Sequence, residues 1–251
     1  MSDMAFIVAV AGKGGVGKTT IASMLVMALA ERARAVVLAI DADPNSNLGE
    51  KLGVKVGRTI GDLREDLLKK AEEMPAGTSK HDMVRYQMKL AMVEGRDFDL
   101  LTMGRPEGPG CYCYINNILR TFIDEAIDSY PYVVIDNEAG LEHLSRRTTK
   151  RMDALMLVSD PTKAGIETAK RISTLADEMD IKVGRRYLLL NRVNEHVPAP
   201  LASSIGPPFN VVQLPEDPEV ARLNAMGEPL SLVPSSNPLR NKVRELAYNL
   251  R

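Results

Sequence analysis

The sequence has only two cysteines and no uninterrupted apolar run that is long enough to cross a bilayer. Two cysteines are too few for the disulfide framework of a small secreted domain. The first apolar run, residues 6–11, leads straight into a glycine-rich loop, so no signal peptide is expected. These absences predict a cytoplasmic protein without a membrane span.

Neither sign of charge is in excess, because 32 Lys and Arg residues stand against 33 Asp and Glu residues, for a net charge of −1. This balance lacks the electrostatic footprint of non-specific nucleic-acid binding, so no nucleic-acid partner is expected. Internal repeats, low-complexity tracts and linkers are also missing. A chain of 251 residues without them is predicted to form a single domain over residues 1–251.

Strand-like apolar runs alternate with segments of helical periodicity. The predicted strands are 6–11, 35–40, 99–103, 132–136, 154–159, 186–191 and 210–214, and the main predicted helices are 19–32, 114–129 and 164–178. This alternation predicts a three-layer α/β fold, in which a mostly parallel sheet is covered by helices on both faces. Residues 59–92 are the exception, because they predict a helical insertion of two helices around a turn at 75–77.

A complete phosphate-binding loop lies between the first predicted strand and the first predicted helix. It consists of Gly12, Lys13, Gly14, Gly15, Val16, Gly17, Lys18 and Thr19. Backbone N–H groups and the helix N-terminus of such a loop face a phosphate, Lys18 reaches the β- and γ-phosphates, and Thr19 supplies a hydroxyl to Mg²⁺. A glycine-rich turn without a ligand is the alternative, but strand and helix both fit. The loop therefore predicts a P-loop fold that binds a nucleoside triphosphate.

Acidic residues follow two of the predicted strands, at the edge of the sheet where ligands bind. A carboxylate at the end of a strand can hold Mg²⁺, and Asp136 is the first candidate, with Asp43 beside it as a second. Asp43 is also the better candidate to orient the attacking water, because the turn at Pro44 fixes its approach. For Asp41 or Asp43 the alternative is that the side chain caps the following helix.

The base pocket is predicted from the last two strands. Guanine-specific loops carry Asn-Lys-x-Asp, whereas residues 191–194 read Asn-Arg-Val-Asn and lack the acid, which favours adenine. Asn191 is the predicted amide partner of the base. Pro215, Glu216 and Asp217 are predicted to form the other wall, and a plain proline-rich turn is the alternative.

Both cysteines, Cys111 and Cys113, lie directly before a predicted helix. A helix N-terminus lowers the pKa of a thiol and so favours binding of a soft metal. Two thiolates cannot complete a four-coordinate site, and a two-fold dimer in which each subunit supplies one pair is the simplest solution. Four thiolates suit tetrahedral Zn²⁺ or square-planar Ni²⁺. Two small buried apolar side chains are the alternative.

Residues 13–20 resemble the deviant Walker A motif of the MinD/ParA/nitrogenase-iron-protein ATPases. Residues 41–47 are similar to their switch I and residues 136–140 to their switch II, and the likeness extends to Asn191 and residues 214–217. Within that class, residues 104–113 resemble the CooC family of nickel-insertion ATPases, which mature carbon monoxide dehydrogenase. One departure is Asn47, which stands where the iron protein has an acid.

The resemblance implies a Mg²⁺-dependent ATPase that forms a nucleotide- and metal-dependent homodimer. Lys13 would cross the dimer interface to the partner's phosphates, and Thr20 would bind the α-phosphate. Cys111 and Cys113 would hold Ni²⁺, or Zn²⁺ in the same site. ATP would close the dimer, and hydrolysis to ADP would reopen it and release nickel to carbon monoxide dehydrogenase.

Two rival functions make different demands on the sequence. An iron–sulfur reductase of the nitrogenase type needs two cysteines per subunit that are far apart in the chain, which this sequence does not have. A MinD/ParA-like positioning ATPase would act on a membrane or on DNA, and residues 239–250 form the basic amphipathic tail that it would use. The same pattern also fits a last helix that packs on the sheet. Neither rival explains the Cys-x-Cys pair.

Overall fold

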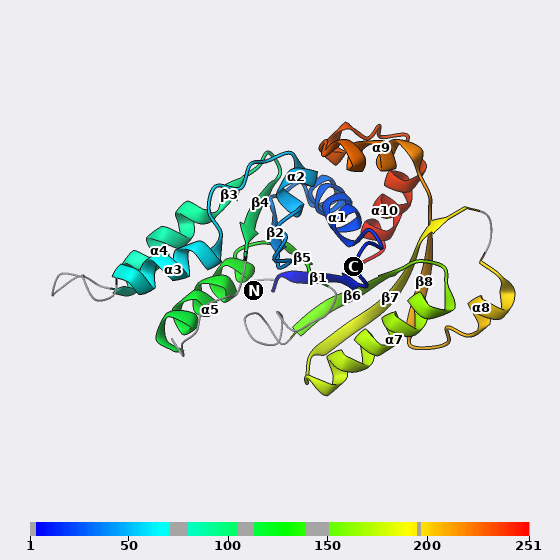
Figure 1. Cartoon of the computed structure of the whole chain (residues 1–251), viewed down its shortest axis with the longest axis horizontal. Helices are drawn as coiled ribbons and strands as arrows, with labels where there is room; N and C mark the ends of the chain where they lie inside the picture. Colours follow the sequence, from blue (N-terminus) through cyan, green and yellow to red (C-terminus); the bar gives the residue numbers. More distant parts are fainter. Residues whose placement is uncertain (1–3, 71–79, 105–112, 139–150, 195–196, 251) are drawn as a thin grey trace.

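The computed structural model describes residues 4–70, 80–104, 113–138, 151–194 and 197–250, and for 67–70, 80, 81, 83, 84 and 113–120 it describes the backbone alone. Within these residues eight strands form one sheet, in the order β3-β4-β2-β5-β1-β6-β7-β8 (Figure 1). They are β1 (Phe6–Gly12), β2 (Val37–Asp41), β3 (Val93–Glu94), β4 (Phe98–Thr102), β5 (Tyr132–Asp136), β6 (Arg151–Ser159), β7 (Lys182–Val193) and β8 (Phe209–Pro215). Every neighbouring pair is parallel except β3 and β4.

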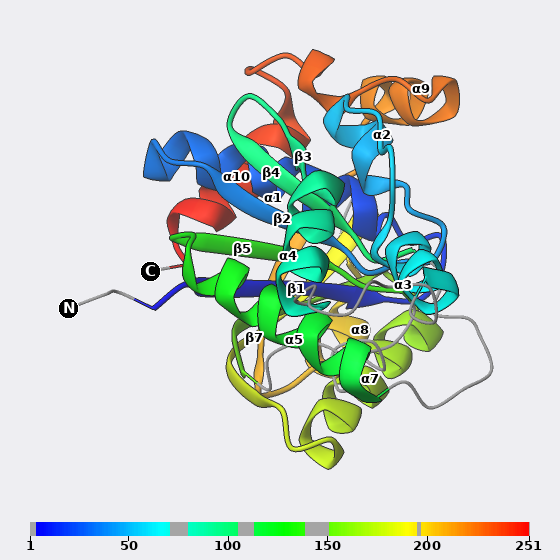
Figure 2. The same cartoon turned by 90° about the vertical axis from the view of Figure 1, so that its left-hand side faces the viewer.

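Helices cover both faces of the sheet. One face carries α1 (Lys18–Ala33), α2 (Leu48–Leu52), α9 (Pro218–Met226), the 3₁₀ helix η1 (Leu230–Leu232) and α10 (Pro238–Tyr248). The other carries α3 (Ile60–Lys70), α4 (Lys80–Ala91), α5 (Cys113–Asp128), α7 (Lys163–Glu178) and α8 (Ala199–Ser203). Figures 1 and 2 show α3, α4 and α5 grouped at one end of the molecule. The predicted three-layer fold with a mostly parallel sheet is confirmed.

Two hydrophobic cores result from the alternation of side chains along the strands. Val8 and Val10 of β1 belong to the core beneath α1 and α10, whereas Ile7 and Ala9 belong to the core beneath α5 and α7. A strand that is buried on both faces must be apolar at every position, which is why the central strands have no alternation of apolar and polar residues. In β2 and β5 only the last residue is charged, and it lies at the carboxyl end of the strand.

The last helix, α10, packs its apolar side against the protein. Leu239, Val243 and Leu246 are buried in the same core as α1, and α1 and α10 lie side by side in Figure 1. The apolar stripe that the sequence shows near its end is therefore part of the core. Within the described residues, no helix is both long and apolar enough to span a membrane.

Candidate nucleotide site

The phosphate-binding loop begins where β1 ends, at Gly12, and closes where α1 begins, at Lys18. Gly12 has φ +149° and its missing Cβ would lie 2.2 Å from the carbonyl oxygen of Val158 in β6. Gly17 has φ +97° and its Cβ would lie 2.6 Å from Nδ2 of Asn191. Both positions require glycine. As described, α1 has no side-chain cap and no acid in its first turn, so its N-terminus faces the loop with its positive end.

The two lysines of the loop have different environments. The side chain of Lys18 is buried, and its ammonium group donates a hydrogen bond to the carbonyl oxygen of Lys13 at 3.3 Å. This contact holds Lys18 across the mouth of the loop. Lys13 itself is exposed, as a lysine that reaches a second subunit must be. The role of Lys13 in trans stays a prediction.

Asp136 and Asp41 form an acidic pair at the carboxyl ends of β5 and β2, where they face each other in the register of the two strands. Asp136 is fully buried, and within the described residues neither of its oxygens accepts a hydrogen bond of ordinary length. Burial raises the pKa of Asp136 to about 7, and the charge of Asp41 adds to the rise. The hydroxyl of Thr19 and the ammonium of Lys18 oppose it.

This environment fits Mg²⁺. In nucleotide sites the ion is held by one or two carboxylates together with the phosphates of the substrate. Asp136 offers two buried oxygens, and Thr19 lies close enough for its hydroxyl to act on the pKa of that carboxyl group. A cation beside Asp136 would remove the cost of burying its charge. The structure thus brings together Lys18, Thr19 and Asp136, as their predicted roles require.

Asp41 has a different use from Asp136. One of its oxygens accepts the N–H of Leu48, the first residue of α2, at 2.9 Å, and the other accepts the N–H of Asp43 at 3.2 Å. Burial raises the pKa of Asp41 to about 6, and these two N–H donors oppose the rise. Asp41 therefore fixes the start of α2, in agreement with the capping alternative.

Asp43 is half-buried at the start of the loop that leads to α2. One of its oxygens accepts both the backbone N–H and the side-chain amide of Asn45, each at 2.8 Å. These bonds fix the carboxylate of Asp43 within a tight turn. The turn at Pro44 is expected from the sequence to fix Asp43 in this way. Its charge contributes to the raised pKa of Asp136, so the two groups are neighbours. Asp43 as the residue that orients water or assists with Mg²⁺ stays a prediction.

The predicted base-pocket residues lie in two places. The amide of Asn191 is buried and donates to the carbonyl oxygen of Val16 at 2.8 Å, which ties the end of β7 to the phosphate loop. Asp217 caps α9 by accepting the N–H of Val220 at 3.0 Å, and its other oxygen accepts from Asn237 at 2.7 Å. Both Asp217 oxygens are therefore engaged within the protein. Pro215 ends β8 and Glu216 is exposed.

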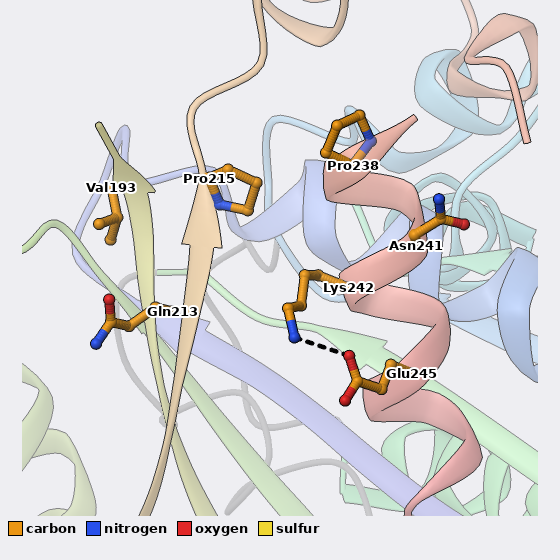
Figure 3. Close-up of a pocket in the computed structure, with 7 residues that line it drawn as sticks. All are labelled: Val193, Gln213, Pro215, Pro238, Asn241, Lys242 and Glu245. Carbon is orange, nitrogen blue, oxygen red and sulfur yellow. Dashed lines mark hydrogen bonds and ion pairs between the residues drawn. The ribbon is translucent and has the colours of Figure 1, made fainter. Parts of the chain in front are cut away.

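A cavity of about 420 Å³ lies on the far side of this wall, between the end of β8 and α10 (Figure 3). It is lined by Val193, Gln213, Pro215, Pro238, Asn241, Lys242 and Glu245. Lys242 and Glu245 form an ion pair of 2.8 Å along α10. Pro215 is shared with the predicted base pocket, but no residue of the phosphate loop lines the cavity, so it is not the nucleotide site.

The predicted metal ligands are Cys111 and Cys113, on either side of the start of α5. Cys111 lies outside the described residues, and Cys113 is described by its backbone alone, as the first residue of α5. The later part of the predicted switch II, residues 139 and 140, also lies outside them. In the part of the chain that the structure describes, no group of three or more His, Cys, Asp or Glu side chains is placed to hold a metal ion.

Two residues near the site were not predicted from the sequence. Asn224 of α9 contacts the hydroxyl of Thr20, and Lys51 of α2 contacts the backbone of Asn224. Helix α9 itself was missed, although Asp217 followed by Pro218, with Gly227 at the end, is the usual pattern of a helix start and stop. The contact between Thr20 and Asn224 has no signal in the sequence, because the residues are 204 positions apart.

Comparison with known proteins gives consistent results. The family model described as the CobQ/CobB/MinD/ParA nucleotide binding domain matches residues 7–230. An uncharacterized ATP-binding protein of Methanocaldococcus jannaschii is 46% identical over 250 residues, covering 97% of this chain and 98% of that protein. The carbon monoxide dehydrogenase accessory protein CooC of Rhodospirillum rubrum is 33% identical over 186 residues, covering 70% of each. A ParA family ATPase from Chlorobium tepidum has a similar fold, with a TM-score of 0.71 over 99% of each chain at 18% identity.

Proposed function

The chain belongs to the CobQ/CobB/MinD/ParA nucleotide-binding family and is an ATPase, and we propose that it uses ATP to insert nickel into carbon monoxide dehydrogenase. In this proposal Cys111 and Cys113 of two subunits together bind one Ni²⁺, and Zn²⁺ can occupy the same site. ATP closes the dimer, and hydrolysis to ADP reopens it and releases the metal. The partners are a second copy of the chain and the dehydrogenase.

The hydrolysis step is assigned to residues at the carboxyl ends of the central strands. Lys18 binds the β- and γ-phosphates, and the exposed Lys13 adds positive charge in the partner's site, where the transition state spreads negative charge. Asp43 orients the water that attacks the γ-phosphorus. When it is held by Asp136 and Thr19, Mg²⁺ supplies the charge that neutralises the phosphate oxygens.

The observation that supports this proposal best is where the Cys-x-Cys segment leaves the sheet. β4 ends at Thr102, which lies opposite Asp41 in the register of β2 and β4, and α5 begins at Cys113. The connection from β4 to α5, which contains Cys111 and ends at Cys113, therefore starts at the carboxyl ends of the strands, where the phosphate loop and the acidic pair also lie. This common starting point supports a link between the nucleotide site and the cysteines. The similarity to CooC of Rhodospirillum rubrum supports the same function.

A positioning ATPase that acts on a membrane or on DNA is the other candidate, since the family model also covers MinD and ParA. The surface that a membrane-binding version would use is the apolar side of α10. Leu239, Val243 and Leu246 on that side are buried in the core, so α10 would have to leave the sheet before it could insert into a bilayer. This cost favours the nickel proposal.

Metal titration of the purified protein tests the proposal. We expect one Ni²⁺ or Zn²⁺ per two chains, with a dimer mass in size-exclusion chromatography that depends on metal and on ATP or ADP. The double variant Cys111→Ser with Cys113→Ser should bind no metal tightly but keep its nucleotide affinity. As a control, His143→Ala with His196→Ala removes two of the three histidines of the chain, which besides cysteines are common ligands of such metals, and leaves both cysteines in place. This variant should behave as the wild type. Unchanged metal content of the cysteine variant in mass spectrometry would refute the ligand assignment, and pelleting of the protein with anionic liposomes and ATP would favour the positioning function.

A further inference from the structure

Asn224, near the end of α9, is hydrogen-bonded to Thr20 in α1, the helix that follows the phosphate loop. Its side-chain nitrogen lies 3.2 Å from the hydroxyl oxygen of Thr20, and its side-chain oxygen lies 3.4 Å from the same atom. Thr20 directly follows Lys18 and Thr19 in the first turn of α1. The amide of Asn224 therefore faces the N-terminal turn of α1, where the nucleotide phosphates bind.

The chemistry of the two groups gives this contact a direction. A threonine hydroxyl has one proton to donate and can accept hydrogen bonds at the same time. The hydroxyl of Thr20 accepts the N–H of Asn224 at 3.2 Å and can donate to the amide oxygen of Asn224 at 3.4 Å. A charged phosphate oxygen is the stronger acceptor, so it can take the proton of Thr20 while the N–H of Asn224 keeps the hydroxyl oxygen in place. We infer that Asn224 is a positioning residue that aims the hydroxyl of Thr20 at the phosphates of the bound nucleotide.

Asn224 is itself held by a second element of the site. Its backbone oxygen accepts from the ammonium of Lys51 of α2 at 3.5 Å, and the side chain of Lys51 is only 12% exposed. Helices α2 and α9 lie next to each other in Figure 2. Lys51 also pairs with Glu50 at 3.0 Å. A lysine at the last carbonyl groups of a helix is favourable, since the helix dipole is negative there. The start of α2 is in turn fixed by Asp41. Asn224 thus joins the phosphate loop to the helix that follows the first switch segment.

The inference rests on the ATP site of the proposed function and is independent of its metal site. A double-mutant cycle tests it, with Mg·ADP affinity measured by isothermal titration calorimetry for Thr20→Val, Asn224→Ala and the double variant. Each single variant should bind about three- to tenfold more weakly, which corresponds to one hydrogen bond. The double variant should be no weaker than the weaker single variant, because Asn224 acts through the hydroxyl that Thr20→Val removes.

Asn224→Asp separates positioning from packing. A carboxylate of nearly the same shape keeps the packing of the amide, but it accepts the proton of Thr20 and brings negative charge near the phosphates. Positioning therefore predicts weaker binding for Asn224→Asp than for Asn224→Ala, whereas packing predicts the reverse order. Arg222→Ala is the matched control on the same helix, because Arg222 is exposed and pairs only with Glu219 and Glu228 in the described residues. It should leave nucleotide affinity unchanged.

Additive losses in the cycle, or near-wild-type affinity of Asn224→Asp, would overturn the inference. Thermal denaturation without nucleotide identifies a variant that is merely misfolded, and the remaining variants then decide the question. The same double-mutant cycle, made in the Cys111→Ser and Cys113→Ser background, should give the same coupling between Thr20 and Asn224.

The two proposals can fail separately. If the cycle shows no coupling but the protein binds metal normally, only the role of Asn224 is refuted. If the wild-type protein does not bind nucleotide, the proposed function itself is refuted.

Discussion

Asp41 and Asp136 are direct neighbours in the sheet, because the last residue of β2 lies opposite the last residue of β5. Both side chains are fully buried, yet they have unlike surroundings. Two backbone N–H groups bind the carboxylate of Asp41, whereas within the described residues Asp136 accepts no hydrogen bond of ordinary length. The pair therefore consists of one carboxylate that backbone N–H groups satisfy and one that has no such donor in the described residues, which fits the predicted role of Asp136 in holding Mg²⁺.

The raised pKa of Asp136 predicts how stability depends on pH. An aspartate in the unfolded chain ionises near pH 4, whereas burial delays ionisation of Asp136 to about pH 7. Between these values the folded state binds the extra proton, so the free energy of unfolding falls as pH rises through this window. We expect the nucleotide-free protein to lose stability relative to Asp136→Asn from pH 4 to pH 7, with no further change above it.

Urea denaturation of both proteins at several pH values, without Mg²⁺ or nucleotide, measures this difference. Asp136→Asn is the appropriate reference because it removes the charge and keeps the shape. Addition of Mg²⁺ and ADP should stabilise the wild type more at pH 8 than at pH 5, since the ion binds the ionised carboxylate. If the free energy of unfolding of the wild type rises relative to that of Asp136→Asn as pH increases, the raised pKa of Asp136 is contradicted.

Lys13→Ala should separate nucleotide binding from hydrolysis. Lys13 is exposed, and through its carbonyl group it contacts Lys18 by a bond that the substitution leaves in place. We expect ADP affinity within about threefold of the wild type and ATP turnover slower by at least about a hundredfold, as for loss of a charge that acts in the transition state. Phosphate release and the ATP-dependent dimer mass are the measurements. Lys18→Ala is the contrasting variant, because it should weaken nucleotide binding itself. If Lys13→Ala hydrolyses ATP at the wild-type rate, Lys13 does not act in the nucleotide site of the partner subunit.

The fold was predictable where burial alone determines it. β5 was predicted at 132–136 and is observed at Tyr132–Asp136. The prediction was possible because an apolar run that ends in an acidic residue is typical of a buried strand whose carboxyl end faces a ligand site. β6 and β7 extend beyond their predicted limits, since charged residues interrupt their additional segments, which therefore contain no continuous apolar run. β3 has two residues and is defined only by its pairing with β4, so the local sequence gives no signal that predicts it.

The site was predictable where a motif contains its own geometry, as in the loop from Gly12 to Thr19. It was less predictable where one residue type has two uses. Asp217 and Pro218 fit a pocket wall as well as a helix start. The structure shows the helix start, because the carboxylate accepts from Val220 and Asn237, whereas the place of Asp217 in the base pocket stays a prediction. Such bonds depend on how α9 and α10 meet, which the local sequence does not contain.

Substitutions of Asn191 can show whether this residue reads the base or supports the loop. In the structure its amide nitrogen donates to Val16 in the phosphate loop, and the residue is buried. Support for the loop predicts that Asn191→Ala weakens ADP and GDP binding by a similar factor, about three- to tenfold for one lost hydrogen bond. Asn191→Asp should be worse than alanine, because a carboxylate would face a carbonyl oxygen that offers no proton. Affinities for both nucleotides are the measurement, and a loss confined to ADP would instead establish Asn191 as a partner of adenine.

Asp217→Ala should destabilise the protein even when no nucleotide is present. One oxygen of Asp217 caps α9, and the other accepts from Asn237, whose own oxygen caps α10 through the N–H of Arg240. Loss of the cap costs about 1 kcal/mol, and the freed amide of Asn237 adds about 1–3 kcal/mol if it stays buried without a partner. We expect urea denaturation to show a fall of about 1–4 kcal/mol in the free energy of unfolding, and the upper part of this range applies if water does not reach the amide. Glu216→Ala, whose side chain is exposed, is the matched control and should change stability by less than about 0.5 kcal/mol. If Asp217→Ala keeps wild-type stability and loses only ADP affinity, the carboxylate belongs to the base pocket and the two caps do not depend on it.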